Sequence, residues 1–126
     1  MSPNYKLSSM AFKFENLKVW QIAFELSNKI HFIALEFPKV EHFNLTSQLK
    51  RASDSVVLNI VEGSTSQSNP EFKRFLNFAY RSCLEVVSCI LLAKARNYIS
   101  EETKIEYYNK YEVLCKMITS LKKSLD

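Results

Sequence analysis

The chain of 126 residues has a net charge of +4 and is 47% hydrophobic, which fits one globular domain and argues against intrinsic disorder. It contains one glycine, so the P-loop and the dinucleotide-binding fingerprint, which need several glycines, are excluded. The longest uncharged apolar stretch, residues 86–93, is too short to span a bilayer, and the N-terminus lacks a secretory signal, so we expect a soluble, cytoplasmic protein with no membrane partner.

Two amphipathic helices are predicted in the first half of the chain. Residues 16–37 carry an apolar stripe with steps of three and four, and Pro38 ends the helix. A second stripe begins near Asn44 or Thr46, either of which would cap the helix, and stops at residue 62. Because glycine adopts positive φ without a Cβ penalty, we expect Gly63 to end this helix in that conformation.

Two further helices are predicted in the second half. Residues 64–69 form a polar turn, and either Ser68 or Asn69 caps a helix that continues to about Tyr98. Ser100 then caps a fourth helix with acidic residues in its first turn. Four such segments with short connections predict an all-α protein, an up-down-up-down antiparallel four-helix bundle at residues 14–126, preceded by an N-terminal arm at residues 1–13.

Residues that could support catalysis are sparse. The histidines, His31 and His42, are separated by a helix end, and no nucleophile elbow is present. The three cysteines lie on or near apolar stripes without zinc spacing, so we interpret them as reduced packing residues. The Glu-x-x-His motif of di-iron bundles is absent. We therefore expect no catalytic residues, no metal site and no cofactor, and thus not an enzyme.

A polar seam follows the second helix, beside its apolar stripe. If the second and third helices pack antiparallel, this seam can meet Ser82 and Glu85. We predict a partly buried network that sets helix register or subunit pairing, the alternative being a solvated face. Its members are Gln48, Arg51, Ser55, Asn59, Glu62, Ser82 and Glu85. Loss of the Asn59 amide should cost about 1–3 kcal/mol, as lost buried hydrogen bonds do.

Positive charge is concentrated in the third helix, where residues 64–99 hold five basic and two acidic side chains. Arginine and lysine contact phosphates without reading bases, so this pattern permits salt-sensitive binding of RNA or DNA; the alternative, which composition alone favours, is a solvated face. The candidate contacts are Lys73, Arg74, Arg81 and Arg96.

An ordered series of short motifs runs through the chain. They are Phe14-Glu-Asn-Leu-Lys-Val-Trp20, the Phe37-Pro38 stop, Gln48 with Arg51, Ser55 to Gly63, Glu71-Phe-Lys-Arg-Phe-Leu76 and Ser82-Cys-Leu-Glu85. Together they resemble one bacterial family, the four-helix bundle proteins encoded in intervening sequences of 23S ribosomal RNA genes. The resemblance covers about residues 12–120, and its most diagnostic block is Asn-Ile-x-Glu-Gly at residues 59–63.

The resemblance implies a homopentamer with no known catalytic activity. Similar proteins are accessory factors of diversity-generating retroelements, where a basic pentamer associates with a reverse transcriptase and nucleic acid. We therefore expect a non-enzymatic adaptor with RNA, DNA or a reverse transcriptase as partner; the alternative is a protein-interaction scaffold with no nucleic-acid role. This chain departs from the family pattern at Arg81, where glycine is usual, and at residues 64–68, which lack a common arginine.

Overall fold

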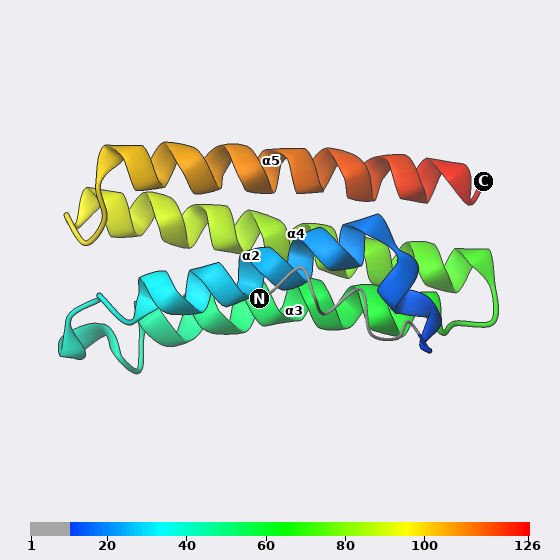
Figure 1. Cartoon of the computed structure of the whole chain (residues 1–126), viewed down its shortest axis with the longest axis horizontal. Helices are drawn as coiled ribbons and strands as arrows, with labels where there is room; N and C mark the ends of the chain where they lie inside the picture. The colour runs from blue at the N-terminus through cyan, green and yellow to red at the C-terminus, as the bar shows by residue number, and fades with distance from the viewer. Residues whose placement is uncertain (1–10) are drawn as a thin grey trace.

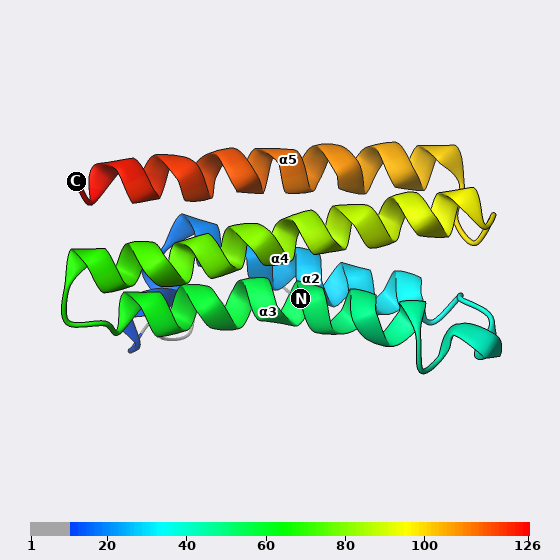
Figure 2. The same cartoon turned by 180° about the vertical axis from the view of Figure 1, so that it is seen from behind.

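The structure is a computed structural model that describes residues 11–126. Its elements are the 3-10 helix η1 (Lys13–Asn16), α2 (Lys18–Ala34), the 3-10 helix η2 (Lys39–Glu41), α3 (Leu45–Ser64), α4 (Asn69–Ala95) and α5 (Glu101–Ser124). Consecutive α-helices run in opposite directions along a common axis (Figures 1 and 2), and residues 11–126 contain no strand. The predicted all-α, antiparallel four-helix bundle is confirmed. The predicted N-terminal arm falls mostly on residues outside those described.

Side-chain caps begin the last two helices. The hydroxyl of Ser68 accepts the backbone N–H of Glu71, with an oxygen-to-nitrogen distance of 3.3 Å, so Ser68 rather than Asn69 caps α4. The hydroxyl of Ser100 accepts the N–H of Thr103 at 3.1 Å and caps α5, as predicted. Each cap satisfies a backbone donor that the helix itself leaves free.

The first helix is shorter than the sequence pattern predicts, because α2 ends at Ala34 rather than at Phe37. Pro38 is extended, with φ −60° and ψ 151°, and the chain turns before it reaches this residue. The turn carries Phe37 back into the core, where its ring lies 5.5 Å from that of Tyr98. Packing therefore retains Phe37 in the apolar core even though it has left the helix.

Gly63 does not have the conformation predicted for it. It lies inside the last turn of α3, and no glycine has a positive φ. A Cβ built at Gly63 would lie 2.8 Å from Cδ1 of Phe72 and 3.1 Å from Cβ of Phe75. The capping prediction is therefore wrong: this position needs glycine because α4 approaches α3 too closely for a side chain, not because the backbone turns.

Within residues 11–126, the residue with a left-handed conformation is instead Asn97, with φ 64°. It follows α4, and the N–H of Tyr98 donates to the carbonyl of Ala93 while that of Asn97 donates to Lys94. This is the Schellman arrangement, in which asparagine takes the place that glycine usually fills. It satisfies the last carbonyls of α4 and starts the turn to α5.

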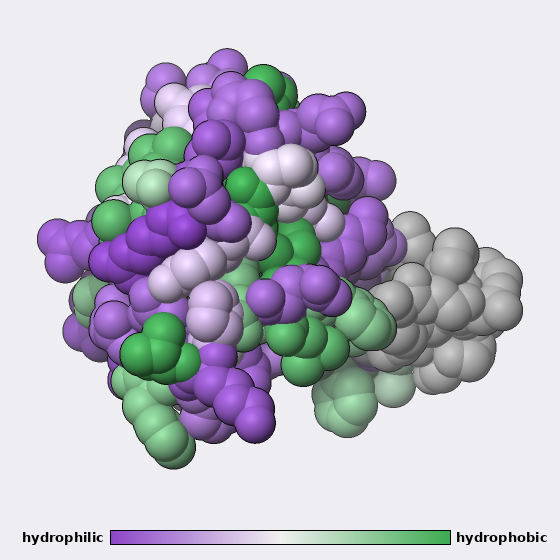
Figure 3. All heavy atoms as spheres, turned by 90° about the vertical axis from the view of Figure 1, so that its left-hand side faces the viewer, coloured by the Kyte–Doolittle hydropathy of each residue, from purple (hydrophilic) through white to green (hydrophobic). Residues whose placement is uncertain are grey.

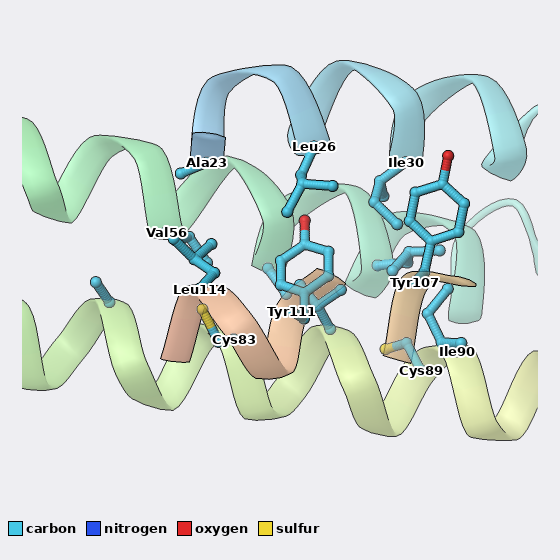
Figure 4. Packing of buried hydrophobic residues seen from close by; sticks show 14 of the residues in the cluster. Ala23, Leu26, Ile30, Val56, Cys83, Cys89, Ile90, Tyr107, Tyr111 and Leu114 are labelled. Carbon is cyan, nitrogen blue, oxygen red and sulfur yellow. The ribbon is translucent and has the colours of Figure 1, made fainter. Parts of the chain in front are cut away.

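The core is one continuous cluster between the four helices, with Leu26, Val56, Ile90 and Leu114 among its buried members (Figure 4). Tyr111 of α5 is 1% exposed, and its hydroxyl points toward Leu26 of α2. Among the described residues this hydroxyl has no hydrogen-bond partner. A buried hydroxyl without a partner costs stability.

Helix α4 is both long and apolar. An 18-residue window of it has a mean hydropathy of 1.4, and one third of that window is buried. By length and composition this helix could cross a membrane, a property shared by core helices of soluble proteins. Among residues 11–126, no other helix meets these two criteria.

Candidate nucleic-acid interface

The four basic candidates, three on α4 and Arg96 directly after it, have different surroundings. Lys73 forms an ion pair with Asp126 at the end of α5, and Arg96 forms one with Glu41, with 3.1 Å between Nη1 and Oε2. The guanidinium of Arg74 lies 5.2 Å from the ring centroid of Phe75, within cation–π range. Arg81 is exposed, and no carboxylate within residues 11–126 pairs with it or with Arg74. These two arginines are therefore the members with an unneutralised charge.

Arg96 belongs to a polar cluster that holds the ends of three elements together. The buried carboxylate of Glu41 in η2 accepts the Tyr98 hydroxyl at 2.8 Å, as well as the Arg96 guanidinium. Its other oxygen accepts the N–H of Leu45, the first residue of α3, and the Asn44 amide. The Tyr98 hydrogen bond, then the Leu45 and Arg96 interactions, lower the pKa of Glu41, while burial opposes them. The charge of Arg96 is therefore neutralised by Glu41 within the fold.

The same cluster corrects the predicted start of α3. Asn44 occupies the cap position but its side chain makes no capping hydrogen bond, and Thr46 lies within the helix. The carboxylate of Glu41, three residues upstream of Asn44, accepts the backbone N–H of Leu45 instead. Negative charge at a helix N-terminus is stabilising, so Glu41 supplies both the acceptor and the charge.

The predicted polar network is brought together only in part. The Ser82 hydroxyl of α4 donates to that of Ser55 on α3 at 2.9 Å, and the half-buried Asn59 amide donates to the carbonyl and hydroxyl of Ser55 at 2.9 and 3.0 Å. This cluster joins α3 to α4 midway along their contact. The remaining members are exposed, and none bonds to the cluster among residues 11–126: Gln48, Arg51, Glu62 and Glu85.

A polar cluster that the sequence did not indicate links α2 to α3. Asp54 accepts a hydrogen bond from the buried Ser27 hydroxyl at 2.7 Å, and His31 Nε2 lies 3.0 Å from the same oxygen. Ser27 and His31 are four residues apart and so share a face of α2. This spacing is the sequence feature that could have indicated the cluster. Because Ser27 donates to Asp54 and not to His31, these residues do not form the nucleophile-to-base relay of a hydrolase.

Two of the three cysteine thiols, those of Cys83 and Cys89, are protected from ionisation. Cys83 of α4 is buried, and the hydrogen bond with Cys115 of α5, together with burial, raises the pKa of Cys83 well above its ordinary range. Burial raises the pKa of Cys89 to about 11. Since the thiolate is the reactive and metal-binding form, both thiols are packing groups at neutral pH. Within residues 11–126 no three His, Cys, Asp or Glu side chains lie close enough together to hold a metal ion.

Large apolar side chains are exposed on several elements. On α4, Leu91 is 43% exposed and Leu84 and Leu92 are also exposed, and on α3 Leu58 is 61% exposed. At the end of the bundle near η2, Phe43 is 91% exposed; Figure 3 views this end and shows hydrophobic residues among hydrophilic ones. Clustered exposed apolar groups on a soluble domain mark interaction surfaces.

Comparison with known proteins matches the chain to a protein family and to solved structures. The model of the 23S rRNA-intervening sequence protein family matches residues 15–120. A crystal structure of a protein of unknown function from the S23 ribosomal protein family of Bacteroides thetaiotaomicron superposes with a TM-score of 0.78 at 24% identity, covering 83% of this chain and 98% of that one. This likeness supports the bundle fold. No curated protein matches the chain.

Proposed function

This chain belongs to the 23S rRNA-intervening sequence protein family, and we propose that it is a homo-oligomeric, non-enzymatic adaptor that binds RNA. The observation that carries the proposal is the outer face of α4, where Arg74 and Arg81 are exposed beside apolar side chains. Seven residues separate these arginines, so they lie on the same side of the helix, about 10 Å apart along its axis. Two cations on the same side of a helix can both contact phosphates of a nucleic-acid backbone.

The apolar part of the face supports self-association. Leu84 and Leu91 share one side of α4 and would be covered if that side packed on a neighbouring subunit, and burial of an apolar side chain contributes about 1.5–3 kcal/mol. A ring of subunits, a pentamer by family resemblance, would repeat the Arg74–Arg81 pair in each copy. Repetition raises affinity for a long polyanion because later contacts are intramolecular.

The test is binding of a fluorescently labelled, structured RNA to the purified oligomer at increasing salt. We expect the logarithm of the affinity to fall linearly with that of the salt concentration, and the double variant Arg74→Glu, Arg81→Glu to bind at least tenfold more weakly with a smaller salt slope. The matched control is Lys13→Glu, Lys39→Glu, which makes the same charge change at two exposed residues elsewhere.

Three results would count against this function. Absence of RNA binding at 50 mM salt would refute it, and unchanged binding after charge reversal of Lys73, Arg74 and Arg81 would refute the contacts. A monomeric mass in sedimentation would refute the assembly. The reverse transcriptase implied by the family resemblance is proposed as a protein partner, to be tested by co-purification; a partner retained by an RNA-free oligomer would favour the scaffold alternative.

A further inference from the structure

A groove runs between α2 and α5, the two helices at the start and end of the bundle. Helix α2 packs closely on α3 but makes few contacts with α5. Two hollows, of about 350 and 410 Å³, lie along this seam. They extend over residues 17–29 of α2 and residues 109–121 of α5, which at 1.5 Å per residue is about 18 Å. The groove is therefore as long as about three turns of a helix.

The groove has an apolar floor. Ile22, Leu26 and Val113 line the first hollow, and Leu17, Met117 and Leu121 join Val113 in the second. Val113 lines both hollows and is 53% exposed, so it lies where they meet. An apolar strip of this kind receives the apolar face of a helix, whose side chains repeat at three and four residues and enter successive hollows.

The rim of the groove is basic. Lys29 and Lys110 line the first hollow, and Lys18 and Lys116 line the second, against one lining carboxylate, Glu25. Lys110 is partly neutralised by Glu106, with 2.6 Å between its ammonium nitrogen and the carboxylate oxygen. Two lysines at each hollow favour an occupant with acidic flanks, because opposite charges across an interface raise the association rate and exclude cationic partners.

We propose that the α2–α5 groove is a docking site for an acidic amphipathic helix of a partner protein. Charge disfavours the occupants that this chain could supply itself. A second copy packed groove to groove would place the four lysines against the same four lysines. Residues 1–10 contain Lys6 and no acidic residue, so they too would bring positive charge to a basic rim. The proposal does not depend on RNA binding, which uses the outer face of α4.

The probe is a labelled 15-residue peptide with leucines at helical spacing and glutamates on both flanks, compared with the same peptide carrying lysines in place of the glutamates. We expect fluorescence anisotropy to show saturable binding of the acidic peptide and at least tenfold weaker binding of the basic one. Val113→Glu should weaken binding of the acidic peptide at least tenfold. Ile105→Glu is the matched control, since it places the same charge at another exposed apolar position of α5.

The rim is tested by Lys29→Glu, Lys116→Glu, which should weaken the acidic peptide tenfold and favour the basic one, whereas Lys13→Glu, Lys39→Glu should have no effect. Equal binding of both peptides would overturn the proposal. So would binding of the fatty acid dodecanoate to a protein that does not bind the acidic peptide, because the groove would then be a small-molecule site. Dissociation of the oligomer in Val113→Glu would also overturn it, because the groove would then be a subunit interface. If Val113→Glu still binds RNA, failure of the docking proposal can be distinguished from failure of the RNA-binding function proposed above.

Discussion

Replacement of Gly63 by alanine tests how closely α3 and α4 approach. On an ordinary helix this change is stabilising by about 1 kcal/mol, because alanine has the higher helix propensity. Here the new Cβ would lie 2.8 Å from Cδ1 of Phe72 and 3.1 Å from Cβ of Phe75. The Phe72 ring can rotate, but the Phe75 Cβ is fixed to the backbone of α4. Overpacking costs about 1–3 kcal/mol, so we expect a net loss of about 1 kcal/mol.

The assay is thermal and urea unfolding followed by circular dichroism. A loss of about 1 kcal/mol corresponds to a fall in Tm of about 4 °C for a chain of this size. Combining Gly63→Ala with Phe72→Leu should recover part of the loss, since the nearest ring atom is removed. Ser88→Ala, an exposed change within α4, is the control and should shift stability by less than about 0.5 kcal/mol. A higher Tm for Gly63→Ala would refute the steric argument.

Three further changes test polar groups. Asn59→Ala should lower the unfolding free energy by about 1 kcal/mol in urea titrations, because its amide loses two hydrogen bonds to Ser55. Tyr111→Phe should raise Tm or leave it unchanged, since the removed hydroxyl is buried without a partner. The Tyr98 hydrogen bond lowers the pKa of Glu41 in the folded protein. The ionised carboxylate therefore stabilises the fold above the pKa that it has in the unfolded chain, and this contribution is lost as pH falls through the lowered pKa of the folded state. Glu41→Gln should flatten the decline in stability measured between pH 5 and 3.

Each of these three predictions has a result that would contradict it. An unchanged Tm and oligomer mass in Asn59→Ala would remove any structural role for the Ser55 cluster. A lower Tm in Tyr111→Phe would mean that the hydroxyl has a partner in solution. If the stability of Glu41→Gln declines with falling pH as steeply as that of the unchanged protein, the acid sensitivity comes from other carboxylates. Those of Glu106 and Asp126, whose pKa values are also lowered by lysines, would then account for it.

Local signals in the sequence predicted the helices well. Apolar residues at steps of three and four place the core stripes, and the caps at Ser68 and Ser100 act on backbone donors within three residues. These features depend on interactions near in sequence, so they can be read without the fold. The error at Phe37 has the same origin, because periodicity continues through an apolar residue that reaches the core from a turn rather than from the helix.

The candidate site was predicted less well, because charge that is free in the sequence is neutralised in the fold. Lys73 and Arg96 look like Arg74 and Arg81 in a helical pattern, yet Asp126 and Glu41 reach them from segments 53 and 55 residues away. The Ser27, Asp54 and His31 cluster similarly joins two helices. Helical periodicity gives the face of a residue but not the neighbour that packs on it.

The helical class, the order and approximate ends of the helices and the family motifs all follow from the amino-acid sequence alone. The role of Gly63, the partners of the basic residues and the separation of α2 from α5 that opens the groove depend on how the helices pack. Helix formation depends on neighbours within about four residues, whereas the spacing between helices and the pairing of charges depend on side chains that only the packed bundle brings together.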